Sequence, residues 1–331
     1  MTRNMAHNLA RSRSQYGAAL LVAMLTVTLV ATFSAAALWQ QWRNVEVESA
    51  ERSRQQTAWL LTGALDWARL ILREDARSGT IDHLAEPWAV PLQEARLSSF
   101  LAVDTSNNSD SADAPPAFLS GHITDMQSRM NVFNLVVGNQ LSKPDMLAFG
   151  KLFELLGLPA SELSGLANNL RLALDAKAAV APVYPQRVEQ LPWLGLSLQS
   201  LARLQPYITL LPDRTPLNVN TASAPVIYAS IPTFEMSDAQ RLVSARARIQ
   251  FRTLAEADKA AAALPDHLSV SSRFFEVQGR LRNDQSLVQE RSLVQRDGMD
   301  VKTIWREREV MHGQVRDPVR DLSTSTSVSL Q

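Results

Sequence analysis

The sequence predicts an α+β fold in which a long N-terminal helix packs on an antiparallel sheet, and an all-helical segment interrupts that sheet. Residues 18–38 form an uncharged apolar run that leads into an amphipathic helix. Residues 273–309 alternate polar and apolar side chains, as strands with one buried face do. Between them, residues 143–264 contain helical segments separated by proline and glycine, which indicates a separate helical domain.

The apolar run is long enough to cross a membrane. About 20 apolar residues at ~1.5 Å each span the hydrocarbon core, which is roughly 30 Å thick. The leader before the run carries Arg3, Arg11 and Arg13 and no acidic residue. This charge keeps the N-terminus in the cytoplasm and directs the rest of the chain outward. The predicted anchor residues are Ala18, Leu21, Val22, Leu25, Leu29 and Leu38.

Two alternatives exist for this segment, a cleaved secretory signal and a retained anchor. A secretory signal has an apolar region of about 7–15 residues followed by small residues, and Ala35-Ala36-Ala37 would provide that site. The run is longer than this, and the polar leader changes to it abruptly at Gly17. Glycine leaves the following peptide bond accessible, so we expect a cut after Gly17 that retains the anchor.

The Gly17-Ala18-Ala19-Leu20-Leu21 junction resembles the processing site of type IV pilins and pseudopilins. The resemblance implies cleavage after Gly17 by prepilin peptidase and N-methylation of Ala18. Most members of that family have a glutamate five residues after the cut, where this chain has Val22. Type II secretion system protein K, the large minor pseudopilin, is the subfamily known for this departure.

The anchor helix is expected to continue into the soluble part of the chain. Residues 45–75 contain no proline and a single glycine, Gly63. Small or apolar residues recur there at the spacing of one helix face: Thr57, Leu61, Ala64, Leu65, Ala68, Ile71 and Leu72. We therefore predict a helix of roughly 55 residues whose second half packs on a soluble domain.

Two groups of acidic residues suggest metal binding without meeting its requirements. His83 and Glu86, with Asp75 or Asp82, lack a second histidine, so a structural turn is favoured. Residues 104–116 contain three aspartates, Asp104, Asp110 and Asp113, which leaves weak calcium binding open. That segment lacks the glycine and distal glutamate of an EF-hand loop, so a solvated loop is favoured and no cofactor is predicted. The segment ending in Glu86-Pro87-Trp88 resembles protein K.

A strand is predicted at residues 120–125, followed by a closely spaced polar series. That series is Asp125, Gln127, Arg129, Asn131 and Asn134, and it resembles an Asp-x-Gln-x-Arg-x-Asn run of protein K. An arginine–carboxylate fork and two asparagines suit an irregular turn fixed by side-chain hydrogen bonds. His122 is the only histidine near Ser128, and the sequence shows no phosphate loop or triad, so we predict that the protein is not an enzyme.

The helical segment is predicted to form its own core. Its expected helices are residues 145–156, 161–179, 198–204, 224–230, 237–249 and 253–263, the last with Thr253 and Glu256 as a capping box.

The segment Asn218-Val219-Asn220-Thr221-Ala222 precedes the fourth of these helices. Followed by two helices, it resembles a helix-hairpin-helix unit, so the insertion is of the SAM-like or helix-hairpin-helix kind. This raises a rival function, membrane-tethered DNA binding. The matching turn, residues 231–236, has no glycine and contains Glu235, which would repel phosphate. Without the three leader arginines, 30 basic residues face 33 acidic ones, a formal charge of −3. We therefore predict no nucleic-acid partner.

Three C-terminal strands complete the prediction, at residues 273–282, 286–296 and 300–309, with a turn at Asn283-Asp284 and a hairpin at Asp297-Gly298. The predicted parts are a leader (1–17), a transmembrane helix (18–38), a pilin-like part (39–142), the helical insertion (143–264), further pilin-like strands (265–310) and a disordered tail (311–331).

The resemblance to protein K covers nearly the whole chain and implies a pilin-like fold. It further implies a minor pseudopilin of the bacterial inner membrane, with its bulk in the periplasm. Its implied partners are the minor pseudopilins I and J at the pseudopilus tip, prepilin peptidase and membrane lipid. A minor type IV pilin is the alternative within the same superfamily.

Overall fold

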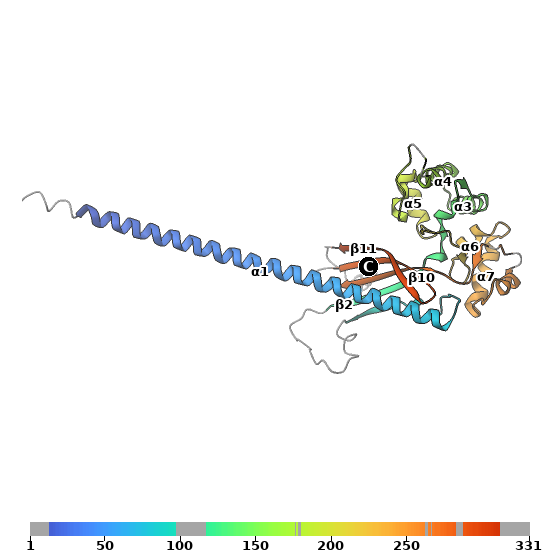
Figure 1. The fold of residues 1–331 in the computed structure, drawn as a ribbon, viewed down its shortest axis with the longest axis horizontal. Helices are drawn as coiled ribbons and strands as arrows, with labels where there is room; N and C mark the ends of the chain where they lie inside the picture. The colour runs from blue at the N-terminus through green and yellow to red at the C-terminus, as the bar shows by residue number, and fades with distance from the viewer. Residues whose placement is uncertain are drawn as a thin grey trace, which may run out of the picture. The chain divides into compact units, whose positions relative to one another are not determined.

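The computed structural model describes residues 13–96, 117–175, 177, 180–261, 264–265, 267–282 and 287–311. The chain divides into two compact units, Met1–Leu60 and Leu61–Gln331. One helix, α1 (Arg13–Ser78), is 66 residues long and contributes to both units (Figure 1). The predicted long helix is therefore confirmed, and it ends three residues beyond the expected Asp75.

The first unit, as far as it is described, consists of α1 alone. Its apolar side chains are exposed from residue 17 to residue 56, for example Leu21 at 69% and Leu38 at 67%. This is the one helix in the described residues that is long and apolar enough to cross a membrane. Trp39 and Trp42 follow the apolar stretch with their ring centroids 5.6 Å apart.

The second unit contains a five-stranded antiparallel sheet. Its strands are β1 (Leu92–Arg96), β2 (Phe118–Asp125), β9 (Phe274–Arg282), β10 (Leu287–Asp297) and β11 (Asp300–Met311), in the order β1-β2-β9-β10-β11. The prediction that a strand before the insertion pairs with strands after it is confirmed, because β2 lies antiparallel to β9. The edge strand β1 was not predicted.

The β10–β11 hairpin differs by one residue from the predicted turn. Asp297 pairs with Asp300, so the two loop residues are Gly298 and Met299 instead of Asp297 and Gly298. Gly298 has φ +57°, a left-handed conformation that glycine adopts without a steric penalty.

The last turns of α1 cover one face of this sheet, as Figure 1 shows. Leu65, Ala68 and Leu72 are buried and form one apolar cluster with Phe275 and Val277 of β9. The same cluster includes Trp88, Val294 and Val301. The predicted helix face is thus the buried one, because its apolar side chains repeat at the helical period and lose water contact together.

The helical insertion lies between β2 and β9 in the sequence. Its helices are α3 (Lys143–Leu155), α4 (Ala160–Leu174), α5 (Leu198–Leu204), α6 (Ala224–Ser230), α7 (Met236–Arg248) and α8 (Leu254–Ala261), with a 3₁₀ helix η4 at Val188–Leu194. Two further 3₁₀ turns, η2 (Met126–Ser128) and η3 (Val132–Leu135), precede them. Two-residue strands form three short pairs: β3 (Met130–Asn131) with β6 (Ile208–Thr209), β4 (Val136–Val137) with β5 (Gln140–Leu141), and β7 (Leu217–Asn218) with β8 (Leu268–Ser269).

All six predicted helices are present, with differences at their ends. The second was expected to reach residue 179 but ends at Leu174, because Asp175 has an extended backbone with ψ 102°. The capping box predicted for α8 is half formed: Thr253 Oγ1 accepts from the Glu256 N–H, but the Glu256 carboxylate accepts from the Arg252 N–H. The helix η4 was not predicted.

The core of the insertion reaches beyond the predicted range 143–264. Met130, Val132 and Leu135 before it and Leu268 after it pack in the same apolar cluster as the helices. The chain therefore passes between the sheet and this helical core at two places, after Asp125 and before Phe274. The predicted leader up to residue 12, the loop 104–116, the turn 283–284 and the tail from residue 312 lie outside the described residues.

Candidate functional site

The predicted processing junction lies within α1. Gly17 is helical, and a Cβ built on it would meet no atom within 4 Å. The anchor residues that follow are exposed, including Ala18, Val22 and Leu29. An exposed helix of apolar residues has no stable place in water, so this arrangement suits a lipid environment.

A buried polar cluster joins the sheet to the helical insertion, and we call it the polar joint: Asp75, Asp82, Asp125, Asn218, Thr221, Ser272 and Arg296. Its centre is the Asp125 carboxylate at the end of β2. Asp125 accepts hydrogen bonds from Thr221 Oγ1 at 2.5 Å, Ser272 Oγ at 2.7 Å and Asn218 Nδ2 at 3.0 Å. The Gln127 N–H donates to its other oxygen at 2.8 Å. Since all four donors are neutral, Asp125 does not form the arginine fork expected from the sequence.

The Asn218-x-Asn220 motif connects the two sides of this joint. Asn218 Nδ2 donates also to the Asp82 carbonyl at 3.1 Å and to Ser272 Oγ at 3.0 Å. Asn220 turns the other way, and its amide exchanges two hydrogen bonds with the backbone of Phe251, at 2.8 and 3.0 Å. The motif that suggested a helix-hairpin-helix therefore fixes the insertion to the sheet.

Arg296 of β10 closes the joint on the side of α1. Its guanidinium donates to Asp75 Oδ2 at 2.7 Å and to both Asp82 oxygens at 2.6 and 2.7 Å. A fourth bond reaches the Ser272 carbonyl at 3.0 Å. The last turn of α1, the loop after it and β10 thereby share one buried cation, whose side chain is 8% exposed.

The acidic residues noted in the sequence meet at this place. One carboxylate oxygen each from Asp75, Asp82 and Glu86 lies within 4.8 Å of the others. The guanidinium of Arg296 already binds two of them, and it would repel a metal ion. Glu86 Oε2 accepts from the His83 N–H at 2.9 Å and from Trp88 Nε1 at 2.7 Å. This geometry supports the structural turn that the sequence favoured.

Burial changes the protonation of this cluster. Desolvation raises the pKa of Glu86 to about 7, against the opposing effect of its two N–H donors. Desolvation also lowers the pKa of His83, whose Nδ1 accepts from the Ala85 N–H. Several carboxyl groups and one guanidinium therefore share a small volume, and a proton on Glu86 reduces their mutual repulsion.

Other side chains of the Asp125–Asn134 series hold the segment that connects β2 to the helical insertion. Asn131 Oδ1 caps η3 by accepting from the Phe133 N–H at 3.1 Å, and it accepts also from the Leu211 N–H. Gln127 Oε1 accepts from the Arg273 N–H at 2.7 Å. The prediction of a turn held by side-chain hydrogen bonds is thus confirmed by these contacts.

The turn between α6 and α7 presents carbonyl groups where a DNA-binding hairpin would present N–H groups. Lys151 Nζ donates to the carbonyls of Ile231, Pro232 and Phe234, at 3.0, 3.3 and 3.1 Å. Glu235 then caps α7 in a capping box with Asp238. This arrangement supports the prediction of no nucleic-acid partner, which stays a prediction.

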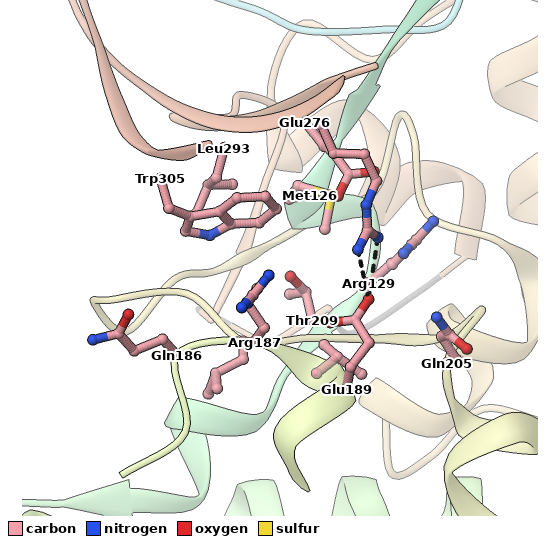
Figure 2. A pocket seen from close by; sticks show the side chains of 13 residues that line it. Met126, Arg129, Gln186, Arg187, Glu189, Gln205, Thr209, Glu276, Leu293 and Trp305 are labelled. Carbon is pink, nitrogen blue, oxygen red and sulfur yellow. Dashed lines mark hydrogen bonds and ion pairs between the residues drawn. The ribbon is translucent and has the colours of Figure 1, made fainter. Parts of the chain in front are cut away.

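A cleft lies where η4 of the insertion faces the sheet (Figure 2). Its volume is about 60 Å³, and Met126, Leu293 and Trp305 form its apolar side. Arg129, Thr209 and Glu276 line it as well. Burial raises the pKa of Glu276, and the nearby Arg291 opposes this effect.

Sequence reasoning missed Arg296, Ser272 and the ion pairs beside the cleft. The signal for Arg296 was its position: Val288, Glu290, Ser292, Val294 and Arg296 alternate along β10 and are all buried. A charged side chain in an inward-facing series requires a buried partner. The sequence does not reveal which residue that partner is.

Comparisons with known proteins agree with this architecture. Residues 217–272 match the family model described as type II secretion system (T2SS), protein K. This segment runs from β7 (Leu217–Asn218) to Ser272 and so includes three members of the polar joint.

Two relatives match along almost their whole length, and both are named type II secretion system protein K. The protein of Pseudomonas aeruginosa is 28% identical over 94% of this chain and 93% of its own. The protein of Pectobacterium carotovorum subsp. carotovorum is 26% identical over 90% of this chain and 97% of its own.

A solved structure shares the fold, with a TM-score of 0.58 at 16% identity over 78% of this chain and 98% of the solved one. It comes from the crystal structure of the GspK–GspI–GspJ complex of the enterotoxigenic Escherichia coli type 2 secretion system. Together with the family model and the two full-length relatives, this structure relates the chain to type II secretion system protein K, a minor pseudopilin of type II secretion.

Proposed function

We propose that the protein occupies the tip of the periplasmic pseudopilus, in a complex with the minor pseudopilins I and J, and supports protein export across the outer membrane. The observation that carries this proposal is the fold shared with a chain solved in a K–I–J complex. The exposed apolar stretch of α1 supports anchoring in the inner membrane by a single span, with the soluble unit in the periplasm.

The proposal includes processing by prepilin peptidase after Gly17, which makes Ala18 the methylated N-terminus. Because Gly17 is helical in the uncut chain, the peptidase has to unwind the first turn of α1 to reach the bond. Glycine reduces this cost, since it is a poor helix former.

Position 22 determines the place in the filament under this proposal. In the pilin superfamily a glutamate there pairs with the N-terminus of the neighbouring subunit. Val22 has no charge to offer, so the chain is unsuited to repeated insertion and suited to an end.

We further propose that the protein has no enzymatic activity and takes no cofactor. The buried polar groups of the joint are engaged with one another, as scaffold residues are, and Arg296 covers the acidic cluster. The likeness to a family of structural pseudopilins supports this assignment.

The first experiment is the intact mass of the protein extracted from membranes. A chain that begins at Ala18 with one added methyl group is the expected result. A start after Ala37, or an intact Met1, would contradict pseudopilin processing and reopen the DNA-binding alternative.

The second experiment is co-purification with I and J from the same cell, with a tag on this chain. We expect all three proteins in one complex of defined stoichiometry. Capture with the major subunit of a type IV pilus, without I and J, would favour the minor-pilin alternative.

Restoring the glutamate tests the role of position 22. We expect Val22→Glu to change the number of copies per complex, whereas Val27→Glu introduces the same charge elsewhere in the anchor and serves as the control. Unchanged stoichiometry in Val22→Glu would remove the missing charge from the explanation.

A further inference from the structure

Besides an apolar cluster of Met126, Leu211, Phe274 and Leu293, two polar attachments join the helical insertion to the sheet. The polar joint is one attachment, and it lies where the chain crosses between the two parts, at Asp125–Met126 and at Ser272–Arg273. The second attachment is a group of four charged side chains beside the cleft, which we call the ionic latch: Arg187 and Glu189 of the insertion, and Arg291 and Glu307 of the sheet.

The latch residues alternate in charge and connect in a row. Arg187 Nη1 lies 2.5 Å from Glu307 Oε1, and Arg291 Nη2 lies 3.0 Å from Glu307 Oε2. Both terminal nitrogens of Arg291 also donate to Glu189 Oε1 at 3.1 Å. The dashed lines that end on Glu189 in Figure 2 mark these bonds. Two of the three pairs therefore cross from the insertion to the sheet.

The latch is accessible to water and dissolved ions. Its four side chains are between 28% and 43% exposed. Exposed ion pairs are weak individually, and salt screens them, with a Debye length of roughly 3 Å at 1 M ionic strength. Behind the latch, polar groups of Arg129, Thr209 and Glu276 line the cleft beside the apolar side chains of Met126, Leu293 and Trp305.

The joint, unlike the latch, is buried and is not reached by dissolved ions. Asp125, Asn218 and Ser272 are each less than 5% exposed, and their hydrogen bonds lie in an environment that ions in solution do not reach. Salt should therefore weaken the latch and leave the joint intact. Because both chain crossings lie in the joint, a released insertion would remain attached there and turn about it.

We propose that the ionic latch is a salt-sensitive fastening, and that its release allows the helical insertion to swing about the polar joint and open the cleft. This inference does not depend on the proposed function, since it uses only contacts within the second unit. It assigns a conformational role to η4, which positions Arg187 and Glu189 against the sheet.

The test measures the distance between the two parts in the full chain, purified in detergent. The chain contains no cysteine, so the pair Ser161→Cys and Glu309→Cys can carry spin labels without background. Both positions are exposed and lie outside the latch, on α4 and β11. We expect one narrow distance distribution at low salt and an added longer component at about 1 M salt, where screening is nearly complete.

Matched variants separate the latch from general salt effects. Glu307→Gln removes two of the three pairs, so the open population at low salt should increase about three- to tenfold. Glu94→Gln removes an exposed pair with Arg282 within the sheet and should leave the distribution unchanged. Circular dichroism checks that each variant is folded.

Two results would overturn the proposal. One is a labelled parent chain whose distance distribution is the same at low and high salt. The other is a folded Glu307→Gln variant that matches Glu94→Gln. If Glu307→Gln does not fold, the salt titration of the parent chain decides alone.

Discussion

At the scale of single residues, a few charged side chains of the second unit are buried and interact with one another. Arg296 is the clearest case, because its guanidinium donates to two buried aspartates and one carbonyl. Removing one partner of a buried pair is costly, since the remaining charge has neither water nor a counterion. The joint therefore depends on Arg296 more than on any exposed arginine.

We predict that Arg296→Met destabilises the protein by ~3–5 kcal/mol, because Asp75 and Asp82 lose their cation while buried. Urea unfolding of the purified protein measures this difference. Arg273→Met is the control: its pair with Asp297 is about half exposed, so the loss should not exceed ~1 kcal/mol. Equal losses in the two variants would show that Arg296 has no special role.

Glu86 should give the protein a pH-dependent stability. Its pKa in the folded protein is about 7, above the ordinary value of 4.5. Between these values the folded state binds more protons than the unfolded state, so this group's contribution to stability falls as pH rises. Glu86→Gln should therefore gain stability relative to the parent as pH increases from 4 to 7, measured by urea unfolding at each pH. A difference independent of pH would contradict the raised pKa.

At the scale of elements, two glycines allow close contacts of the central strand β9, one with the neighbouring strand β2 and one with the helix α1. Gly121 of β2 pairs with Gly279 of β9. A Cβ on Gly121 would lie 2.6 Å from the Gln278 carbonyl oxygen, whereas a Cβ on Gly279 would meet the Leu61 side chain at 3.4 Å. The first contact is with backbone and the second with a side chain that can move slightly.

Gly121→Ala should therefore destabilise the protein by ~1–3 kcal/mol through displacement of β2 from β9. Gly279→Ala is the matched control across the same strand pair and should cost clearly less. Thermal unfolding and amide exchange of β2 measure both variants. A larger loss in Gly279→Ala would mean that the helix contact is tighter than the strand contact.

The sequence located most elements but not all of their ends. α5 and α6 match the predicted ranges because proline, glycine and capping residues mark their limits. The helix α4 was predicted too long because helical periodicity continues past Leu174, where the backbone becomes extended. The 3₁₀ helix η4 was missed because it contains Pro192, which indicates a break when the sequence is read alone.

At the scale of the whole molecule, the second unit does not depend on the apolar half of α1 for its stability. None of the side chains in the apolar window of α1 is buried. The sheet core, in contrast, requires Leu65, Ala68 and Leu72 from the same helix.

A chain that begins at residue 57 should therefore be soluble without detergent and should melt at the temperature of the full chain. A chain that begins at residue 73 should aggregate, because it exposes Phe275 and Val277. Sedimentation and thermal unfolding of the two truncations test this. If both are soluble and equally stable, the packing of α1 on the sheet is not needed for folding.

The sequence by itself determined the anchor, the long helix, the interrupted sheet and the resemblance to protein K. The length of an apolar run, its periodicity and the turn residues are local properties, because each depends on residues that are close together in the sequence. They can therefore be recognised without the structure. The tertiary structure alone decided the joint and the latch. Asp82 and Arg296 are 214 residues apart, and Glu189 and Arg291 are 102 apart. Pairing between distant residues depends on how the chain folds back on itself, and no local pattern encodes which arginine meets which carboxylate.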